Sequence, residues 1–331
     1  MRAYIIKRLL LVIPTVFVVT LIVFFIIRLI PGDVVDKMSQ MILSTGGGID
    51  VATAQEMIRQ QLGLDVPILH QYGRWIGVVA QANGSFSGLF QGDLGVSLWR
   101  PTSVLEEIGM RWPVTLELGV MGLIIGQLIA LPVGIYSALR QDTWGDYIGR
   151  SFAIFCMAVP TFWIGTLVIV FPAIWWGYMP PIIFVPFFED PIGNLKMFIV
   201  PATILGAGMS GGSMRMTRTM MLEVLRQDYI RTAWAKGLRE RVVILRHALK
   251  NALIPVITII GLFMPVLIGG AVIVEAIFNL PGMGSLIVHA TIYRDYPILS
   301  GTVLVFGLGM VIINLIVDLT YAYLDPRVRY R

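Results

Sequence analysis

Residues 223–250 read EVLRQDYIRTAWAKGLRERVVILRHALK, a polar and largely basic stretch between two long apolar segments. Apolar positions from Leu222 to Leu238 recur at the three- and four-residue spacing of an amphipathic helix. Gly237 follows where a left-handed residue would end that helix. A second helical run begins near Val242 and leads into the next apolar segment. The stretch therefore predicts a helix, a glycine corner and a second helix that project from a membrane into the cytoplasm.

The composition places the chain in a membrane. Its 331 residues are 56% hydrophobic and only 14% charged, with a mean hydropathy of +0.80. Soluble domains have about 25% charged residues. The net charge of +5 is compatible with nucleic-acid binding, but the basic residues lie in short segments beside apolar runs, as membrane topology places them. We therefore expect an all-α integral membrane protein in contact with a lipid bilayer, without a nucleic-acid partner.

Six apolar segments are long enough to cross a bilayer as helices. We expect them at about residues 9–27, 114–139, 151–175, 197–222, 252–274 and 294–321. The first follows a basic start, as in a secretory signal peptide, but no small-residue cleavage site follows it, so we interpret it as a retained helix. Pro160 and Pro172 should bend the third. Four glycines should interrupt the fourth: Gly206, Gly208, Gly211 and Gly212.

The basic residues also predict the orientation. They concentrate at the start of the chain, at the ends of the 140–150 connection, in residues 215–250 and in the tail. The positive-inside rule then places both termini and the 223–250 loop in the cytoplasm. This predicts three regions: residues 1–30 with the first membrane helix, an extracytoplasmic region 31–112, and a membrane core 113–331.

The extracytoplasmic region has its own helix and turn signals. A helix should follow Asp50 as its cap and end at Gly63, and a second should begin near Pro67. Residues 92–95 read GDLG and predict a turn. Acidic residues outnumber basic ones in this region, which suits an outer face.

The basic stretch resembles the EAA loop of ABC importer permeases. The resemblance rests on Arg231-Thr232-Ala233, then Gly237, then His247-Ala248-Leu249. The run from Asp228 to Ala233, followed by Ala235-Lys236-Gly237-Leu238, is similar to the form found in dipeptide, oligopeptide and nickel permeases. This chain departs from the general motif at Arg231, His247 and Lys250. Such departures are usual in the peptide branch of the family. Further similar segments, among them Pro31-Gly32-Asp33 and Asp325-Pro326-Arg327, extend the resemblance over nearly the whole chain.

The resemblance implies a function. The chain would be one permease subunit of an importer in a bacterial or archaeal cytoplasmic membrane. Its partners would be a second homologous permease subunit, two cytoplasmic ABC ATPase subunits that hold ATP and Mg, and an extracytoplasmic solute-binding protein. Residues 229–238 would form a coupling helix seated in an ATPase cleft. The loop residues that the resemblance assigns to coupling are Asp228, Tyr229, Arg231, Thr232, Ala233, Ala235, Lys236, Gly237, Leu238 and His247.

Other interpretations of the loop and of the whole chain stay open at this point. The basic residues could serve only as anchors against anionic lipid. The chain could also be an ATP-independent secondary transporter, a channel or a membrane scaffold. A secondary transporter would commonly show paired halves in its hydropathy, and the sequence has no clear internal repeat.

The second membrane segment carries small residues at every fourth position. Gly122, Gly126, Ala130 and Gly134 fall in one register, which predicts a groove for close approach of another helix. The simpler interpretation is that glycine is common in membrane helices. We favour the packing seam.

Ionisable residues within membrane segments are candidates for function. Glu117, Glu275 and Asp318 qualify, each near the end of a predicted helix. A structural role at the headgroup level or as a helix cap is the alternative for each.

The sequence offers no enzyme active site. Gly206, Gly211, Gly212 and Ser213 have the spacing of a phosphate-binding loop, but glycine replaces the lysine and the stretch is apolar. The single cysteine, Cys156, cannot form an intrachain disulfide. The three histidines are scattered, so no metal site is expected. We expect no cofactor on this chain.

Overall fold

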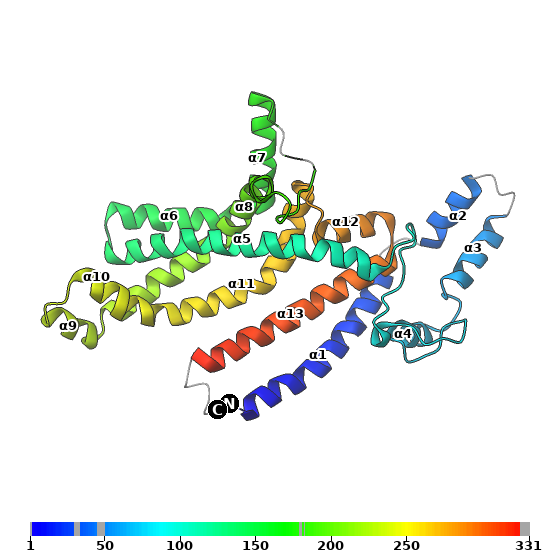
Figure 1. Cartoon of the computed structure of the whole chain (residues 1–331), viewed down its shortest axis with the longest axis horizontal. Helices are drawn as coiled ribbons and strands as arrows, with labels where there is room; N and C mark the ends of the chain where they lie inside the picture. Colours follow the sequence, from blue (N-terminus) through cyan, green and yellow to red (C-terminus); the bar gives the residue numbers. More distant parts are fainter. Residues whose placement is uncertain (1, 30–33, 45–49, 179–180, 182, 325–331) are drawn as a thin grey trace. The chain divides into compact units, whose positions relative to one another are not determined.

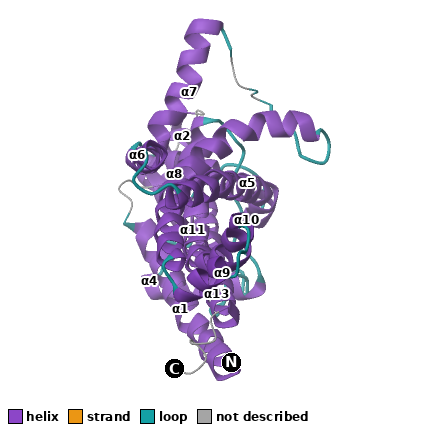
Figure 2. Cartoon of the chain, turned by 90° about the vertical axis from the view of Figure 1, so that its left-hand side faces the viewer, coloured by secondary structure: helices purple, strands orange, loops and turns teal. Residues whose placement is uncertain are grey.

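The structure is a computed structural model that describes residues 2–29, 34–44, 50–178, 181 and 183–324. These residues form helices and no β-strand (Figure 2), apart from one isolated bridge between Val96 and Ser103. The prediction of an all-helical membrane protein is confirmed. The similar segments at residues 31–33 and 325–327 lie outside the described residues.

Five helical runs among the described residues are long and apolar enough to cross a membrane. They lie in α1 (Arg2–Arg28), α5 (Val104–Leu139), α8 (Pro191–Leu225), the run Glu240–Met264 and α13 (Tyr296–Leu324). A sixth exists if α6 (Trp144–Ala158) and α7 (Thr161–Trp176) form one broken span.

The break between α6 and α7 bends the chain by 92° at Val159 and Pro160. The predicted bend at Pro160 is confirmed, because a proline removes a helix hydrogen bond and collides with the preceding turn. Pro172 instead lies inside α7. The predicted start at residue 151 was wrong, since α6 already begins at Trp144.

The chain divides into two compact units. The first comprises Met1–Val12, Trp112–Ser285 and Gly309–Arg331, and the second comprises Ile13–Arg111 and Leu286–Leu308. Each unit is described by itself below.

In the first unit, α8 is the helix on which the others pack: α6, α7 and α11 (Leu249–Ile277) all contact it (Figure 1). The predicted interruption by glycines was wrong, because α8 is continuous. Its glycines instead leave room for neighbouring helices to approach closely. A Cβ added at Gly208 would lie 3.1 Å from Thr161 of α7, and a Cβ added at Gly212 would lie 3.0 Å from Phe263 of α11. Because Gly206, Gly211 and Ser213 also lie within this helix, they form no phosphate-binding loop.

The small residues of α5 face α8. A Cβ added at Gly126 would lie 2.8 Å from the carbonyl oxygen of Gly206, and one at Gly134 equally close to that of Met214. A Cβ added at Gly122 would lie 3.1 Å from the Leu205 side chain. Ala130 is fully buried beside Met214. Helix α5 also begins ten residues before the predicted boundary, at Val104, and continues through Pro113.

A buried ion pair joins α6 to α8 in the first unit. Arg218 donates two hydrogen bonds of 2.7 Å to the two carboxylate oxygens of Asp146, which is fully buried. The Asp142 backbone N–H donates a third bond of 3.1 Å to the same carboxylate. This geometry fixes both side chains in one arrangement, as paired and hydrogen-bonded charges require.

The second unit contains the short helices α2 (Val34–Ser44), α3 (Val51–Gln61) and α4 (Ile68–Ile76) and the 3₁₀ turn η1 (Leu89–Gln91). The helices after Asp50 and near Pro67 and the turn at residues 92–95 are confirmed. The Asp50 side chain makes no capping hydrogen bond, contrary to prediction. Helix α2 was not predicted; it packs on α3 through Val35 and Ile58.

The loop before α5 is tied to the segment that joins α12 (Met283–Tyr293) to α13, within the second unit. The Asp295 carboxylate accepts hydrogen bonds from the Ser97 hydroxyl and from the Leu98 N–H. The Trp99 indole donates a bond of 2.9 Å to the Tyr293 carbonyl. These bonds hold the segment before α13 beside the loop.

Asp146→Ala should lower the free energy of unfolding by about 3–5 kcal/mol, the usual cost of leaving one partner of a buried ion pair unpaired. Thermal unfolding of the detergent-solubilised chain measures the change. Asp228→Ala is the control, since it breaks an ion pair whose side chains are 74% and 94% exposed. Equal losses in the two variants would show that the buried pair adds nothing to stability.

Candidate functional site

Helix α9 (Asp228–Ala235) follows α8 directly and is eight residues long. Gln227 precedes it in an extended conformation, and Asp228 places a negative charge in its first turn, where the helix dipole favours one. Thr232 donates a hydrogen bond of 3.0 Å to the Asp228 carbonyl. The predicted helix is therefore present, from the first residue of the similar run.

The helix ends in a glycine corner of the Schellman type. The Leu238 N–H donates to the Ala233 carbonyl at 3.4 Å, and the Gly237 N–H donates to the Trp234 carbonyl at 2.9 Å. Gly237 has φ of +74°, which glycine adopts without steric cost. No atom lies within 4 Å of the place where its Cβ would stand, so the corner faces open space.

One face of α9 is buried. Ile230 is fully buried and Ala233 nearly so. They belong to a cluster with Ala138 at the end of α5, Met221 near the end of α8, and Val243 beyond the corner; Ile244, Ala248 and Ala252 complete it. The short helix is thus packed against the ends of three long helices.

The opposite face of α9 is open and combines aromatic with basic residues. Tyr229 is 43% and Trp234 44% exposed, and Leu238 is also exposed. Arg231, Thr232, Ala235 and Lys236 are exposed as well. An exposed face of this composition is suited to protein contact, because aromatic and arginine side chains contribute most at interfaces.

The chain returns to the membrane through a π-helical segment. After α10 (Glu240–Val242), residues Val243–Ala248 form the π-helix η2, which runs directly into α11. His247 is partly buried here, and its carbonyl accepts a hydrogen bond from Asn251. Asn251 also donates to the Tyr229 hydroxyl at 2.8 Å, which joins the two arms of the loop.

Of the three candidate acids, Glu275 is fully buried. Its carboxylate accepts hydrogen bonds from the Thr115 hydroxyl at 2.6 Å, from the Gly284 N–H at 2.7 Å and from the Ser285 N–H at 3.2 Å. Thr115 in turn accepts from the Met283 N–H at 2.8 Å. Glu275 therefore holds the start of α12 against α5 and α11, as a carboxylate at a helix N-terminus does.

The other two acids lie apart from Glu275 in sequence and make separate contacts. Asp318 in α13 forms an ion pair of 3.0 Å with Arg8 in α1. Glu117 in α5 is partly buried, and its Oε1 has no hydrogen-bond partner. The contacts found for the three acids therefore have no partner in common.

Sequence reasoning missed the partners that hold these elements. Thr115 and Asn251 carry no motif that marks them as such, because their partners are 160 and 22 residues away in the chain. Asp146 and Arg218 were missed for the same reason, at a separation of 72 residues.

Comparison with family models gives matches at both ends of the chain. Residues 130–330 match the binding-protein-dependent transport system inner membrane component, and residues 1–119 match the N-terminal part of such a membrane component.

Full-length relatives agree. A putative peptide transport system permease protein of Brucella abortus (strain 2308) is 39% identical over 330 residues, with 100% of both chains covered. The glutathione transport system permease protein GsiC of Pectobacterium atrosepticum is 37% identical over 331 residues, and that of Escherichia coli (strain K12) is 36% identical, again with full coverage.

A solved structure shares the fold. The crystal structure of an amino acid ABC transporter with histidines matches 66% of this chain and 94% of that chain, with a TM-score of 0.51 and 13% identity. These comparisons exclude the alternatives of an ATP-independent transporter, a channel and a scaffold. The chain belongs to the family of binding-protein-dependent transport system inner membrane components, as a permease subunit of the peptide and oligopeptide ABC importers, in which separate subunits hydrolyse ATP.

Proposed function

We propose that this permease subunit carries short peptides, glutathione-like tripeptides among them, and that α9 is the element through which ATP hydrolysis drives it. The names of the relatives support the substrate class. The observation that carries the role of α9 is that one of its faces is buried while the other is exposed. Ile230 anchors one face in the protein, while Tyr229 and Trp234 leave the other face open for a partner.

The proposed assembly contains a second homologous permease subunit, two cytoplasmic ATPase subunits that bind ATP and Mg, and an extracytoplasmic binding protein. The family description supports the binding protein. Large apolar side chains exposed on α6 and α7, such as Phe155 and Trp175, support contact with lipid or with the second permease. This chain itself would bind no cofactor.

In the proposed topology, the chain spans a bacterial inner membrane six times and both termini lie in the cytoplasm. Helices α6 and α7 then form one bent span. Residues 31–112 form the large extracytoplasmic region, and α9 lies in the cytoplasm with both termini. The concentration of basic residues in and around the 223–250 loop supports this orientation.

The proposed mechanism follows from the cluster beneath α9. A partner that binds the open face differently in its ATP-bound and ATP-free forms shifts the permease between two states, and without that difference it would shift nothing. Because Ile230 and Ala233 pack against the ends of α5, α8 and α11, a displacement of α9 reaches three helices at once. The solute pathway would then open to one side of the membrane at a time.

Gly237→Trp should uncouple ATP hydrolysis from uptake. The substitution forces a bulky residue into left-handed backbone at a cost of about 1–2 kcal/mol and fills the space beside the corner. We expect uptake in proteoliposomes to fall about tenfold, the ratio given by ~1.4 kcal/mol, while the assembled complex still hydrolyses ATP.

Gly237→Asn is the matched control, because asparagine tolerates left-handed backbone. It should retain most of the uptake. Full coupling in the tryptophan variant would count against the assignment of α9, and failure of both variants to assemble would show that the corner is needed for folding instead.

We further propose that the extracytoplasmic region docks the binding protein through α3. Ala54 and Ile58 face inward, and Ile58 packs with Val35. Val51 is 47% and Met57 58% exposed. Large apolar side chains left exposed on a helix that is anchored by other residues support contact with a protein.

Met57→Asp should raise the concentration of binding protein needed for half-maximal uptake about fivefold to tenfold, since loss of a central apolar contact costs roughly 1 kcal/mol or more. Phe90→Asp, in η1, is the control for an added charge on an exposed apolar residue of the same unit. Titration of binding protein against a fixed amount of reconstituted transporter measures both. Equal shifts in the two variants, or none in either, would remove α3 from the docking surface.

A further inference from the structure

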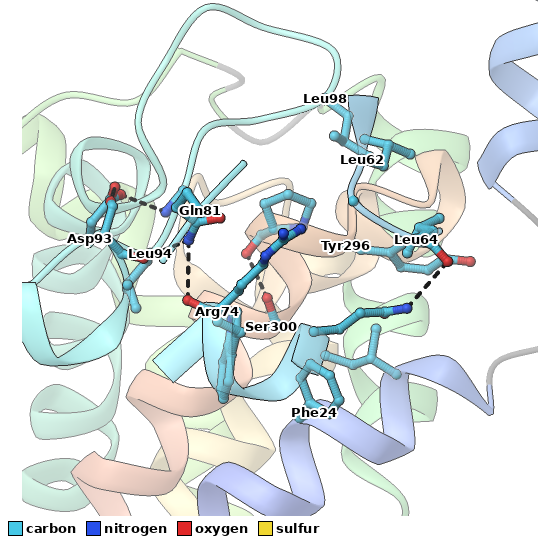
Figure 3. A pocket seen from close by; sticks show the side chains of 18 of the residues that line it. Phe24, Leu62, Leu64, Arg74, Gln81, Asp93, Leu94, Leu98, Tyr296 and Ser300 are labelled. Carbon is cyan, nitrogen blue, oxygen red and sulfur yellow. Dashed lines mark hydrogen bonds between the residues drawn. The ribbon is translucent and has the colours of Figure 1, made fainter. Parts of the chain in front are cut away.

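The second unit contains a pocket of about 700 Å³ that the roles proposed above do not use (Figure 3). Its walls come from the end of α1, the segment after α3, helix α4, the loop before α5 and the start of α13. The volume is that of a small-molecule site, for which roughly 300–1,000 Å³ is usual.

Two arginines line this pocket. Arg74 in α4 donates one hydrogen bond, from Nε to the Ala80 carbonyl at 3.2 Å. Arg28 at the end of α1 donates to the Gln71 side chain at 2.9 Å and to the Phe24 carbonyl at 3.1 Å. Among the described residues, no carboxylate lies within ion-pair distance of either guanidinium. Both terminal amino groups of Arg74 therefore remain to donate to a ligand in the bidentate geometry that carboxylates favour.

A carboxylate lines another part of the same pocket. Asp93 accepts hydrogen bonds from the Ser87 hydroxyl and, at 2.8 Å, from the Gly95 N–H. A carboxylate has acceptor capacity for about four bonds, so Asp93 has room for a ligand ammonium group. Figure 3 shows the Arg74 side chain between Asp93 on one side and Tyr296 on the other. The pocket thus presents separate groups for an anion and for a cation.

The remaining lining is partly aromatic and apolar. Phe24 is almost fully buried, with its ring centroid 5.8 Å from that of Trp75. Leu94 and Leu98 line the pocket as well. Surfaces of this kind hold the apolar part of a ligand, while a few polar groups fix its orientation.

We propose that this pocket binds a short peptide as a zwitterion, with the C-terminal carboxylate on Arg74, the ammonium group on Asp93 and an apolar side chain against Trp75. The peptide class rests on the proposed function. The carboxylate and ammonium complementarity rests on the pocket itself. Phosphatidylethanolamine carries an anion and an ammonium too, so the test includes lipid as a second source of the same chemistry.

The test is calorimetric titration of the full chain in phosphatidylcholine nanodiscs. The probes are alanyl-phenylalanine, its C-terminal amide and its N-acetyl form. We expect saturable binding of the free dipeptide, and weakening of roughly tenfold or more in each blocked form, since each loses a hydrogen bond between charged groups. Arg74→Gln should weaken binding of the free dipeptide by the same factor and leave binding of the C-terminal amide unchanged.

Arg100→Gln is the matched control, since Arg100 is exposed in the same unit and does not line the pocket. Asp93→Asn is a second variant, which should weaken binding of the free dipeptide and leave binding of the N-acetyl form unchanged. Unfolding temperatures of all variants identify any that misfold.

Equal binding of the free and blocked dipeptides, or no binding, would overturn the proposal. A lipid headgroup site would also overturn the proposal. In that case dipeptide binding disappears in nanodiscs that contain phosphatidylethanolamine, and this lipid co-purifies with the wild type but not with Arg74→Gln. None of these outcomes depends on ATP, so failure here is distinct from failure of the Gly237 test of coupling.

Discussion

Close approach of α8 to its neighbours is the constraint on which the membrane part of the first unit depends. Helices surrounded by lipid gain little from burying apolar side chains against one another, so contact between backbones supplies the attraction. Gly126 and Gly206 provide that contact between α5 and α8. Gly208 and Gly212 leave room on α8 for α7 and α11. A side chain at Gly126 or Gly206 would collide with the backbone of the other helix and separate the two.

Buried polar groups then specify which arrangement the close-packed helices adopt. Glycine contacts alone tolerate sliding of one helix along another, whereas a hydrogen-bonded carboxylate does not. Glu275 has three donors, from α5 and from the start of α12. Asp146 has its donors from Arg218 and from the turn before α6. Because an unpaired buried charge is costly, each site penalises any register in which its donors are displaced.

The sequence predicted what depends on neighbouring residues. The helical spacing and Gly237 correctly predicted a helix that ends in a glycine corner. The break at Arg226 and Gln227, which separates α9 from α8, was not predicted, because the helical spacing continues through it. The bend at Pro160 was predicted because a proline acts on its own turn. The glycines of α8 were misinterpreted as breaks, since in water glycine weakens a helix, while in a membrane helix it permits contact. The pocket around Arg74 could not be predicted, because its walls join residues 24–28 with residues 296–300.

The π-helix η2 bears on how α9 can act. A π segment carries one extra residue per turn, so it marks a place where the hydrogen-bond ladder of the helix has shifted. On the α8 side α9 is joined by the short link at Gln227, and on the α11 side by η2. The two connections differ in kind: one is a break in the helix and the other is a π-helical segment that continues into α11. In the coupling role proposed above, Ile230 would transmit a displacement of α9 to Met221 near the end of α8 and to Val243 in η2, because these side chains share one buried cluster. We expect α11 to take up such a displacement at η2, because the regular hydrogen-bond ladder is already altered there.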